Sequence, residues 1–306
     1  MNCRYWARVG RTMLGVGVFA ILLTACGGGG RELNMPVRMS LGPHPDLEDI
    51  KQMVRSNSQP VVTLTATCNA VLANVDMRPT KQLKMDGNLF LAKPGRMRVD
   101  LRRAGKLAVR VVGDGQKYET RMPMLGGLHY SGRYGDPLEK KGGRIHFVAD
   151  DVEDALDMTT LFDGTVQALR TYPPLLDVHF PDSPSARELH SAVYVDSLRV
   201  MSAPAPPLQI LSSLAIDRRT GRVLALDKFR ADGSLRTRIW ILNWRTVTGP
   251  DMREDAPEGM SVAVDVPSDF VIYYPPPLEG TSVLIHLSDI KLNAFVDKQL
   301  FVVGRE

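Results

Sequence analysis

The stretch GNLFLAKPGRMRVDLRR, residues 87–103, decides the fold class, because it contains two short strands joined by a tight turn. Apolar and polar side chains alternate before and after the turn KPG (93–95). Successive side chains of a strand point to opposite faces, so Met97, Val99 and Leu101 share one face and the arginines share the other. The stretch therefore predicts an antiparallel hairpin with one apolar face.

The same alternation continues on both sides of this hairpin. VTLTATCNA (62–70) precedes it as a strand with one apolar face, and places Cys68 on that face as a buried structural thiol. After the hairpin, another apolar alternation ends at the turn GDG (113–115), and QKYETRMP (116–123) forms the next strand. The GDG turn is not a phosphate loop, because no helix and no lysine–serine pair follow it.

The second half of the chain is again rich in strands. IDRRTGRVLALDKF (216–229) and LRTRIWILNW (235–244) predict closely spaced hairpins. In the second of these, the isoleucines are expected on one face and Trp240 and Trp244 on the other. SVAVDV, FVIYY, SVLIHLSDI and QLFVVG supply the last strands. Roughly ten to twelve strands at this spacing predict a mainly β (α+β) fold, with one curved antiparallel sheet and a few covering helices.

Two helices are predicted beside the sheet. Asp46 can cap the first, in which Leu47, Ile50 and Val54 share one face. The second covers 150–172, and acidic residues crowd its first turn. We expect these acids to complement the positive end of the helix dipole. A catalytic carboxylate pair is the alternative, although no partner base stands nearby in the sequence.

Residues 1–25 are predicted to be a lipoprotein signal peptide. Three arginines, Arg4, Arg8 and Arg11, precede an apolar run at 13–25, and no acidic residue accompanies them. The run is shorter than the ~20 apolar residues of a membrane span. It also lacks the amphipathic spacing of a core helix.

The apolar run ends at LTAC (23–26), which resembles the lipobox of bacterial lipoproteins. The thiol of Cys26 is the only group there that can carry a thioether-linked diacylglycerol. Two or three acyl chains hold a protein firmly on a membrane. Residues 26–45, with four glycines at 27–30, are then the lipidated cysteine and a flexible tether, and 46–306 form the folded domain. An ordinary secretory signal with a chance cysteine is the alternative.

The residue after the cysteine is Gly27, not an acid. In the enterobacterial sorting pattern, an acid at this place retains a lipoprotein at the inner membrane. The resemblance therefore predicts a lipid-anchored protein of the cell envelope, at the outer membrane and facing the periplasm.

Composition excludes several classes of function. Three of the 38 basic residues lie in the signal peptide, so the remaining chain, with 34 acidic residues, has a formal net charge of only +1. Such a balance provides no electrostatic footprint for nucleic acid. Cys68 has no partner for a disulfide once Cys3 and Cys26 are accounted for. The single, scattered histidines favour no metal site, and we expect no cofactor.

The hairpin motifs together resemble one family. GNLFLAKPGRMRVDLRR, the strand ending in VVGDGQKYET, IDRRTGRVLALDKF with IWILNW, and FVIYYPPPLEGTSVLIHLSDIKLN are similar to segments of the carrier and receptor proteins that move lipoproteins across the bacterial periplasm. The likeness to this LolA/LolB-like superfamily covers most of residues 46–295. It implies an open half-barrel with helices closing its mouth, and an apolar concave face that accepts acyl chains.

The apolar faces of the predicted strands supply candidates for such a cavity. Acyl chains need a contiguous apolar surface with few hydrogen-bonding groups. The candidate lining residues are Leu89, Leu91, Met97, Val99, Val109, Val111, Leu214, Ile216, Ile239 and Ile241.

Three functions remain open on these grounds. We favour a membrane-anchored, monomeric module that binds lipid or the acyl chains of lipoproteins, for lipoprotein localisation. The alternative is a structural or interaction lipoprotein of the same fold with a filled core. An envelope hydrolase is disfavoured because the sequence has no GxSxG motif and no histidine set, so we predict that the protein is not an enzyme. Two roles are open for the arginines of the opening hairpin, which are Arg96, Arg98 and Arg102. They either contact lipid headgroups or form a face of the sheet that is exposed to solvent.

Overall fold

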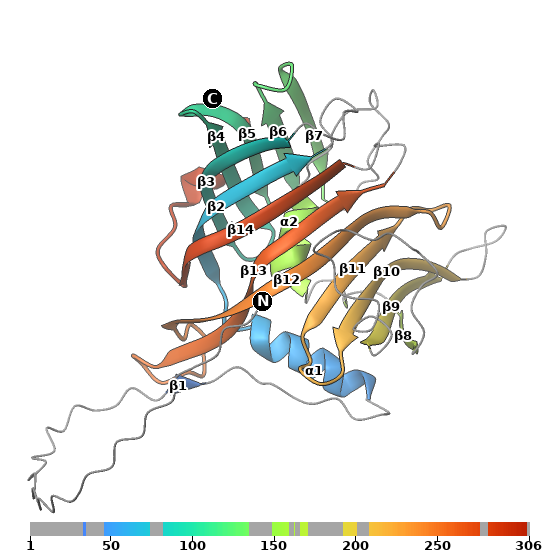
Figure 1. Ribbon diagram of the computed structural model, residues 1–306. Helices are drawn as coiled ribbons and strands as arrows, with labels where there is room; N and C mark the ends of the chain where they lie inside the picture. Colours follow the sequence, from blue (N-terminus) through green and yellow to red (C-terminus); the bar gives the residue numbers. More distant parts are fainter. Residues whose placement is uncertain are drawn as a thin grey trace, which may run out of the picture. The chain divides into compact units, whose positions relative to one another are not determined.

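The computed structural model describes residues 33–34, 46–73, 82–134, 149–158, 162, 166–170, 192–200, 208–275 and 281–304. They belong to one compact unit, Glu32–Glu306. Most of them form a single antiparallel sheet (Figure 1) whose strands follow the order β7-β6-β5-β4-β3-β2-β14-β13-β12-β11-β10-β9-β8. The predicted fold class is confirmed: the sheet is curved, mainly antiparallel and not closed into a barrel.

The strands have the following bounds. The first half of the sheet contains β2 (Thr63–Ala73), β3 (Gln82–Ala92), β4 (Arg96–Arg103), β5 (Lys106–Asp114), β6 (Lys117–Met122) and β7 (Leu128–Arg133). The second half contains β8 (Val166–Arg170), β9 (Ala192–Val200), β10 (Leu208–Asp217), β11 (Val223–Phe229), β12 (Leu235–Pro250), β13 (Ser261–Tyr274) and β14 (Thr281–Leu292). A short strand, β1 (Leu33–Asn34), pairs in parallel with β13.

The opening hairpin is formed by β3 and β4, with Leu91 paired to Met97 and Leu89 to Val99. β2 and β14 then pair with each other and join the first half of the sheet to the second, so the earliest and the latest strands of the domain lie side by side. The pairing of β2 with β14 therefore joins two antiparallel meanders into one continuous sheet.

The curvature of the sheet follows from the contacts of helix α2 (Ala149–Leu156). This helix touches β6 and β12, which are seven places apart in the sheet. Seven strand spacings would span about 34 Å in a flat sheet. A helix is only ~10–12 Å across, so the sheet must curl around α2 for both contacts to exist. The face toward α2 carries the main apolar core.

The first helix, α1, runs over Leu47–Ser58 as predicted. Asp46 is its N-cap, and its side chain accepts a hydrogen bond from the backbone N–H of Glu48 at 3.0 Å. Ile50 and Met53 are the buried residues of its apolar face. The helix contacts β13 and β8, so it lies over the second half of the sheet.

The second predicted helix is much shorter than expected. The prediction of a helix over 150–172 is wrong for its second part, because α2 ends at Leu156 and residues 166–170 form β8. Val166 to Arg170 pair antiparallel with β9, from Leu198 back to Tyr194. Tertiary pairing at the sheet edge has overridden the local helical pattern.

The two tryptophans of β12 do not share a face, contrary to the prediction. Register shifts between Ile241, Asn243 and Trp244 insert β-bulges in its pairing with β13. A bulge adds a residue to one strand and so reverses the faces beyond it. Trp240 belongs to a small cluster on the outer face of the sheet, whereas Trp244 packs against the main core.

One of the arginines of β4, Arg98, holds the C-terminal segment of the chain. Arg98 donates to Asp100 at 2.7 and 2.9 Å, and its Nη1 donates to the carbonyl oxygen of Leu300 at 3.2 Å. Leu300 lies in a short 3-10 helix, Lys298–Phe301, that crosses this face of the sheet. Arg98 therefore has a structural role that neither sequence hypothesis included.

Candidate functional site

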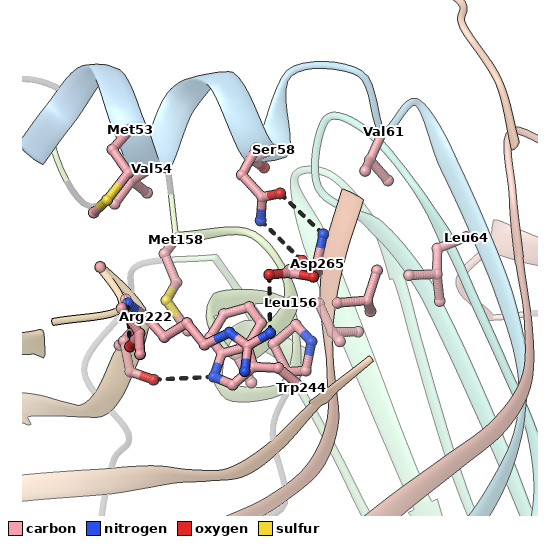
Figure 2. A pocket seen from close by; sticks show the side chains of 17 residues that line it. Met53, Val54, Ser58, Val61, Leu64, Leu156, Met158, Arg222, Trp244 and Asp265 are labelled. Carbon is pink, nitrogen blue, oxygen red and sulfur yellow. Dashed lines mark hydrogen bonds and ion pairs between the residues drawn. The ribbon is translucent and has the colours of Figure 1, made fainter. Parts of the chain in front are cut away.

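The candidate site is a pocket at the mouth of the half-barrel, below α1. It has a cavity volume of about 70 Å³. Figure 2 shows Met53 and Val54 reaching in from α1, with Met158, Arg222 and Trp244 opposite them. The other lining residues come from both helices, from the β10–β11 turn and from β2 and β13: Asn57, Ser58, Val61, Leu64, Ala155, Leu156, Thr220, Gly221, Val223, Asp265, Val266 and Pro267.

The size of the cavity limits what it can enclose as it stands. A cavity must have a volume of roughly 10–15 Å³ to hold one water molecule. The space below α1 therefore holds a few methylene-sized groups.

One wall of the pocket is polar and well ordered. Asn57 of α1 and Asp265 of β13 exchange two hydrogen bonds, from Asn57 Nδ2 to the Asp265 carbonyl at 2.8 Å and from the Asp265 N–H to Asn57 Oδ1 at 3.0 Å. The Asp265 carboxylate also accepts from Arg222 at 3.1 Å and from Thr246 at 2.6 Å. These bonds fasten the end of α1 to the sheet (Figure 2).

Lys93, from the KPG turn of the opening hairpin, joins the ends of the two helices. Its ammonium group forms an ion pair with Asp157 at 2.9 Å and donates to Ser58 Oγ at 2.6 Å and to the Ser58 carbonyl at 2.9 Å. Ser58 Oγ in turn donates to Asp157 at 2.7 Å. Burial lowers the pKa of Lys93, although Asp157 opposes this shift. The ends of the helices that cover the pocket are therefore joined by Lys93 and by the direct hydrogen bond between Ser58 and Asp157.

The acids of α2 form buried ion pairs with the sheet. Asp151 accepts from Arg236 at 2.8 Å and from Lys228 at 3.2 Å, and Asp154 pairs with Lys228 as well. Burial opposes the ionisation of Asp151, but Arg236 and Lys228 outweigh it and lower its pKa. The acids of α2 were expected to interact with the positive end of the helix dipole. Asp151 and Asp154 in addition pair directly with basic residues of β11 and β12.

Glu153 differs from Asp151, because several negative charges lie around it. It is 6% exposed and accepts a hydrogen bond from the backbone N–H of Gly95. Burial, together with the negative charges of Asp154, Asp157 and Asp150, raises the pKa of Glu153 to about 7. Its charge therefore changes near neutral pH, next to the Lys93 contacts.

The ten strand residues predicted to line a cavity all lie in the main core, and each is at most 3% exposed. None of them lines the pocket, but two are paired with residues that do. Leu91 is opposite Leu64, and Ile216 is opposite Val223. The pocket thus lies beside the apolar surface formed by the ten predicted residues, at the edge of that surface and below the helices.

Sequence reasoning missed Trp244, Arg222, Asp265 and Met158 as pocket residues. The bulges that turn Trp244 toward the pocket leave no mark in the hydrophobic alternation. Arg222 follows the stretch RRTG (218–221) between two predicted strands, and its place beside a turn does not mark it as a pocket residue. Cys26 lies outside the described residues. Cys68 is fully buried as predicted, and burial raises the pKa of its thiol to about 12.

Within the described ranges, no group of three or more His, Cys, Asp or Glu side chains is arranged to hold a metal ion. In the same part of the chain, no helix combines the length and apolarity that crossing a membrane requires.

Comparisons with known proteins give matches in structure alone. No protein-family model matches the chain, and neither does any curated protein. A DUF1329 family protein from Desulfovibrio piger matches with a TM-score of 0.51 and 10% identity, over 84% of this chain and 95% of that one. A LolA superfamily protein from Nitrosomonas europaea matches with a TM-score of 0.47 and 12% identity, over 83% of this chain and 96% of that one.

The first of these matches shows that the two chains share a fold. At 10% sequence identity, it shows nothing about a shared function. The curved, open sheet expected from the hairpin motifs is therefore a fold that this chain shares with that protein.

Proposed function

We propose that the protein is an envelope lipoprotein, anchored through Cys26, that holds an acyl chain of a lipid or a lipoprotein in the pocket below α1. One observation carries the binding part of this proposal. The pocket combines side chains of two helices with the helix-covered face of an open sheet, and most of its lining is apolar. An apolar recess with a few ordered polar groups is the usual form of a site for an amphiphilic ligand.

The lining also suits a ligand that enters by displacing the helices. Met53 and Met158 have flexible side chains that can repack around a guest. Behind the helices, the ten buried strand residues form an apolar surface that a longer chain would reach. Binding, and not catalysis, is the role that this arrangement supports, with the outer membrane as the proposed location.

A fluorescent fatty acid, added to the mature chain, tests this proposal. Val54→Trp places a large side chain in the pocket, while Val166→Trp changes an exposed valine on β8 and serves as the matched control. We expect the parent and the control to bind the probe alike, and V54W to lose at least tenfold in affinity. Equal binding by V54W and V166W would contradict the pocket as the site.

A second candidate function is favoured by one specific observation. The ten strand residues are packed to at most 3% exposure, so this part of the helix-covered face is filled. A structural or interaction lipoprotein of the same fold would have such a core. If all three proteins ignore the probe, this second function replaces the first.

A further inference from the structure

A single side chain, that of Asn293, joins three loops at one end of the sheet. Its Oδ1 accepts from the N–H groups of Val62 at 2.8 Å and Thr63 at 3.2 Å. Its Nδ2 donates to the carbonyl oxygens of Pro60 at 2.8 Å and Pro250 at 2.6 Å. Both donors and both acceptor sites of the amide are therefore used, which fixes the three loops relative to one another.

We call the joined segments, residues 60–63, 250–252 and 293–295, the Asn293 platform. Two further contacts stiffen it. Thr63 Oγ1 donates to the carbonyl of Ala294 at 2.7 Å. A Cβ atom on Gly249 would lie 2.7 Å from the Cβ of Leu292, so the end of β12 packs directly against the end of β14.

The Asn293 platform presents apolar side chains to solvent. Phe295 is 95% exposed, Met252 is 55% exposed and Val62 is 40% exposed. Met252 is two residues from Pro250, and Phe295 is two residues from Asn293, so each lies within about 7.6 Å, along Cα atoms, of a residue bonded in the platform. Contact of exposed apolar side chains with water is unfavourable, so three of them on one hydrogen-bonded support make the platform a candidate contact surface.

The path of the chain indicates what this surface faces. β1 pairs with Ser261 and Val262 of β13, and the same two residues are opposite Pro250 and Gly249 of β12. Figure 1 shows β1 at the end of the long β12–β13 hairpin. Only seven residue steps separate Cys26 from Leu33, which extend to at most about 25 Å. A lipid on Cys26 would therefore keep this end of the sheet close to the bilayer.

We propose that the Asn293 platform is the surface through which the protein contacts the lipid bilayer, with Phe295 inserted at the boundary between the headgroups and the acyl chains. This inference rests on the lipid anchor in the proposed function. Aromatic side chains are suited to the interface of a membrane. Exposed Lys291 and Lys298 flank Phe295 in the sequence and can face anionic headgroups.

The test places an environment-sensitive fluorophore at position 295. Phe295→Cys is made in the full chain, and the mature lipidated protein is labelled with a nitrobenzoxadiazole maleimide. Cys68 is fully buried, so it does not compete for the label. The protein is then reconstituted into vesicles of phosphatidylethanolamine and phosphatidylglycerol, with or without bromine on the acyl chains. Met124→Cys, at a partly exposed methionine of the β6–β7 turn, is the matched control.

We expect blue-shifted emission and quenching by bromine at position 295, and neither at position 124. Emission typical of water at both positions overturns the inference. A blue shift without bromine quenching also overturns it, because the side chain then lies against protein. Protein that is not recovered with the vesicles overturns the anchor and this inference together. This measurement does not depend on acyl-chain binding in the pocket. A failure of pocket binding would be detected by the fatty-acid experiment and not by this one.

Discussion

Lys93 shows how much of the arrangement around the pocket depends on one residue. Its ammonium group is the contact shared by the opening hairpin, the end of α1 and Asp157 after α2. Lys93 lies in the turn KPG (93–95), and nothing in the neighbouring sequence distinguishes it from a solvent-exposed turn lysine. Its partner Asp157 is 64 residues away in the sequence, so the pairing follows from the fold alone.

Replacing this lysine tests its structural weight. Lys93→Met removes the ion pair with Asp157, whose side chain is 5% exposed. Removing one partner of a buried pair costs about 3 kcal/mol, so we expect the free energy of unfolding in urea to fall by about that amount. Lys51→Met, which removes a pair with the exposed Glu48, is the control and should cost less than about 1 kcal/mol. Equal losses in the two variants would refute the role of Lys93.

At the scale of elements, the helix α2 carries a pH dependence. The pKa of Glu153 is raised to about 7, mainly by burial and then by Asp154, Asp157 and Asp150, against 4.5 for an ordinary glutamate. The folded protein therefore binds this proton more tightly than the unfolded chain does. Ionisation of Glu153 begins to reduce stability above pH 4.5, and the loss is complete above about pH 7, where it amounts to roughly 3 kcal/mol.

Glu153→Gln removes this ionisation and keeps an oxygen that can accept from Gly95. We expect E153Q to be more stable than the parent at pH 8, by up to about 3 kcal/mol, and the difference to shrink toward pH 4.5. Urea unfolding at several pH values measures it. Glu48→Gln, at a side chain that is 72% exposed, controls for the loss of a carboxylate. An unchanged slope of stability between pH 4.5 and 7.5 in E153Q would contradict the account.

The elements also show where sequence reasoning succeeds and where it fails. Period-two alternation placed Leu64, Cys68 and Leu89 on the buried face, because each strand has one apolar face against the core. The same rule failed at Trp244, since a β-bulge depends on the pairing partner and not on the strand's own residues. The helix predicted over 150–172 failed at 166–170 for another reason, because pairing with β9 decided the conformation there.

At the scale of the whole molecule, one curved antiparallel sheet with a few helices could be predicted from the number and spacing of strands. The openness of the sheet was an implication of the family resemblance. The site could be predicted only in part. The apolar surface of the strands was expected, but the pocket lies at its edge and is completed by contacts between segments far apart in the sequence. Arg222 and Asp265, 43 residues apart, are one such pair.

The proposed anchor also belongs to this scale. Cys26→Ser should leave the folded domain intact but remove the acceptor of the lipid, so we expect the protein to move from the membrane fraction to the soluble periplasmic fraction. Cell fractionation with intact-mass analysis checks this, since the parent should carry the added mass of acyl chains. Cys68→Ser, at the buried thiol, is the control and should keep the parent's location. Membrane retention of the C26S protein would contradict the anchor.

The central claim is that the pocket below α1 holds an acyl chain, and native mass spectrometry with lipid extraction of the mature parent chain and of V54W tests it most directly. We predict that the parent carries a bound acylated molecule, beyond the lipid on its own cysteine, and that V54W carries much less of it. A parent chain free of any such molecule, or equal occupancy of the two proteins, would contradict the claim.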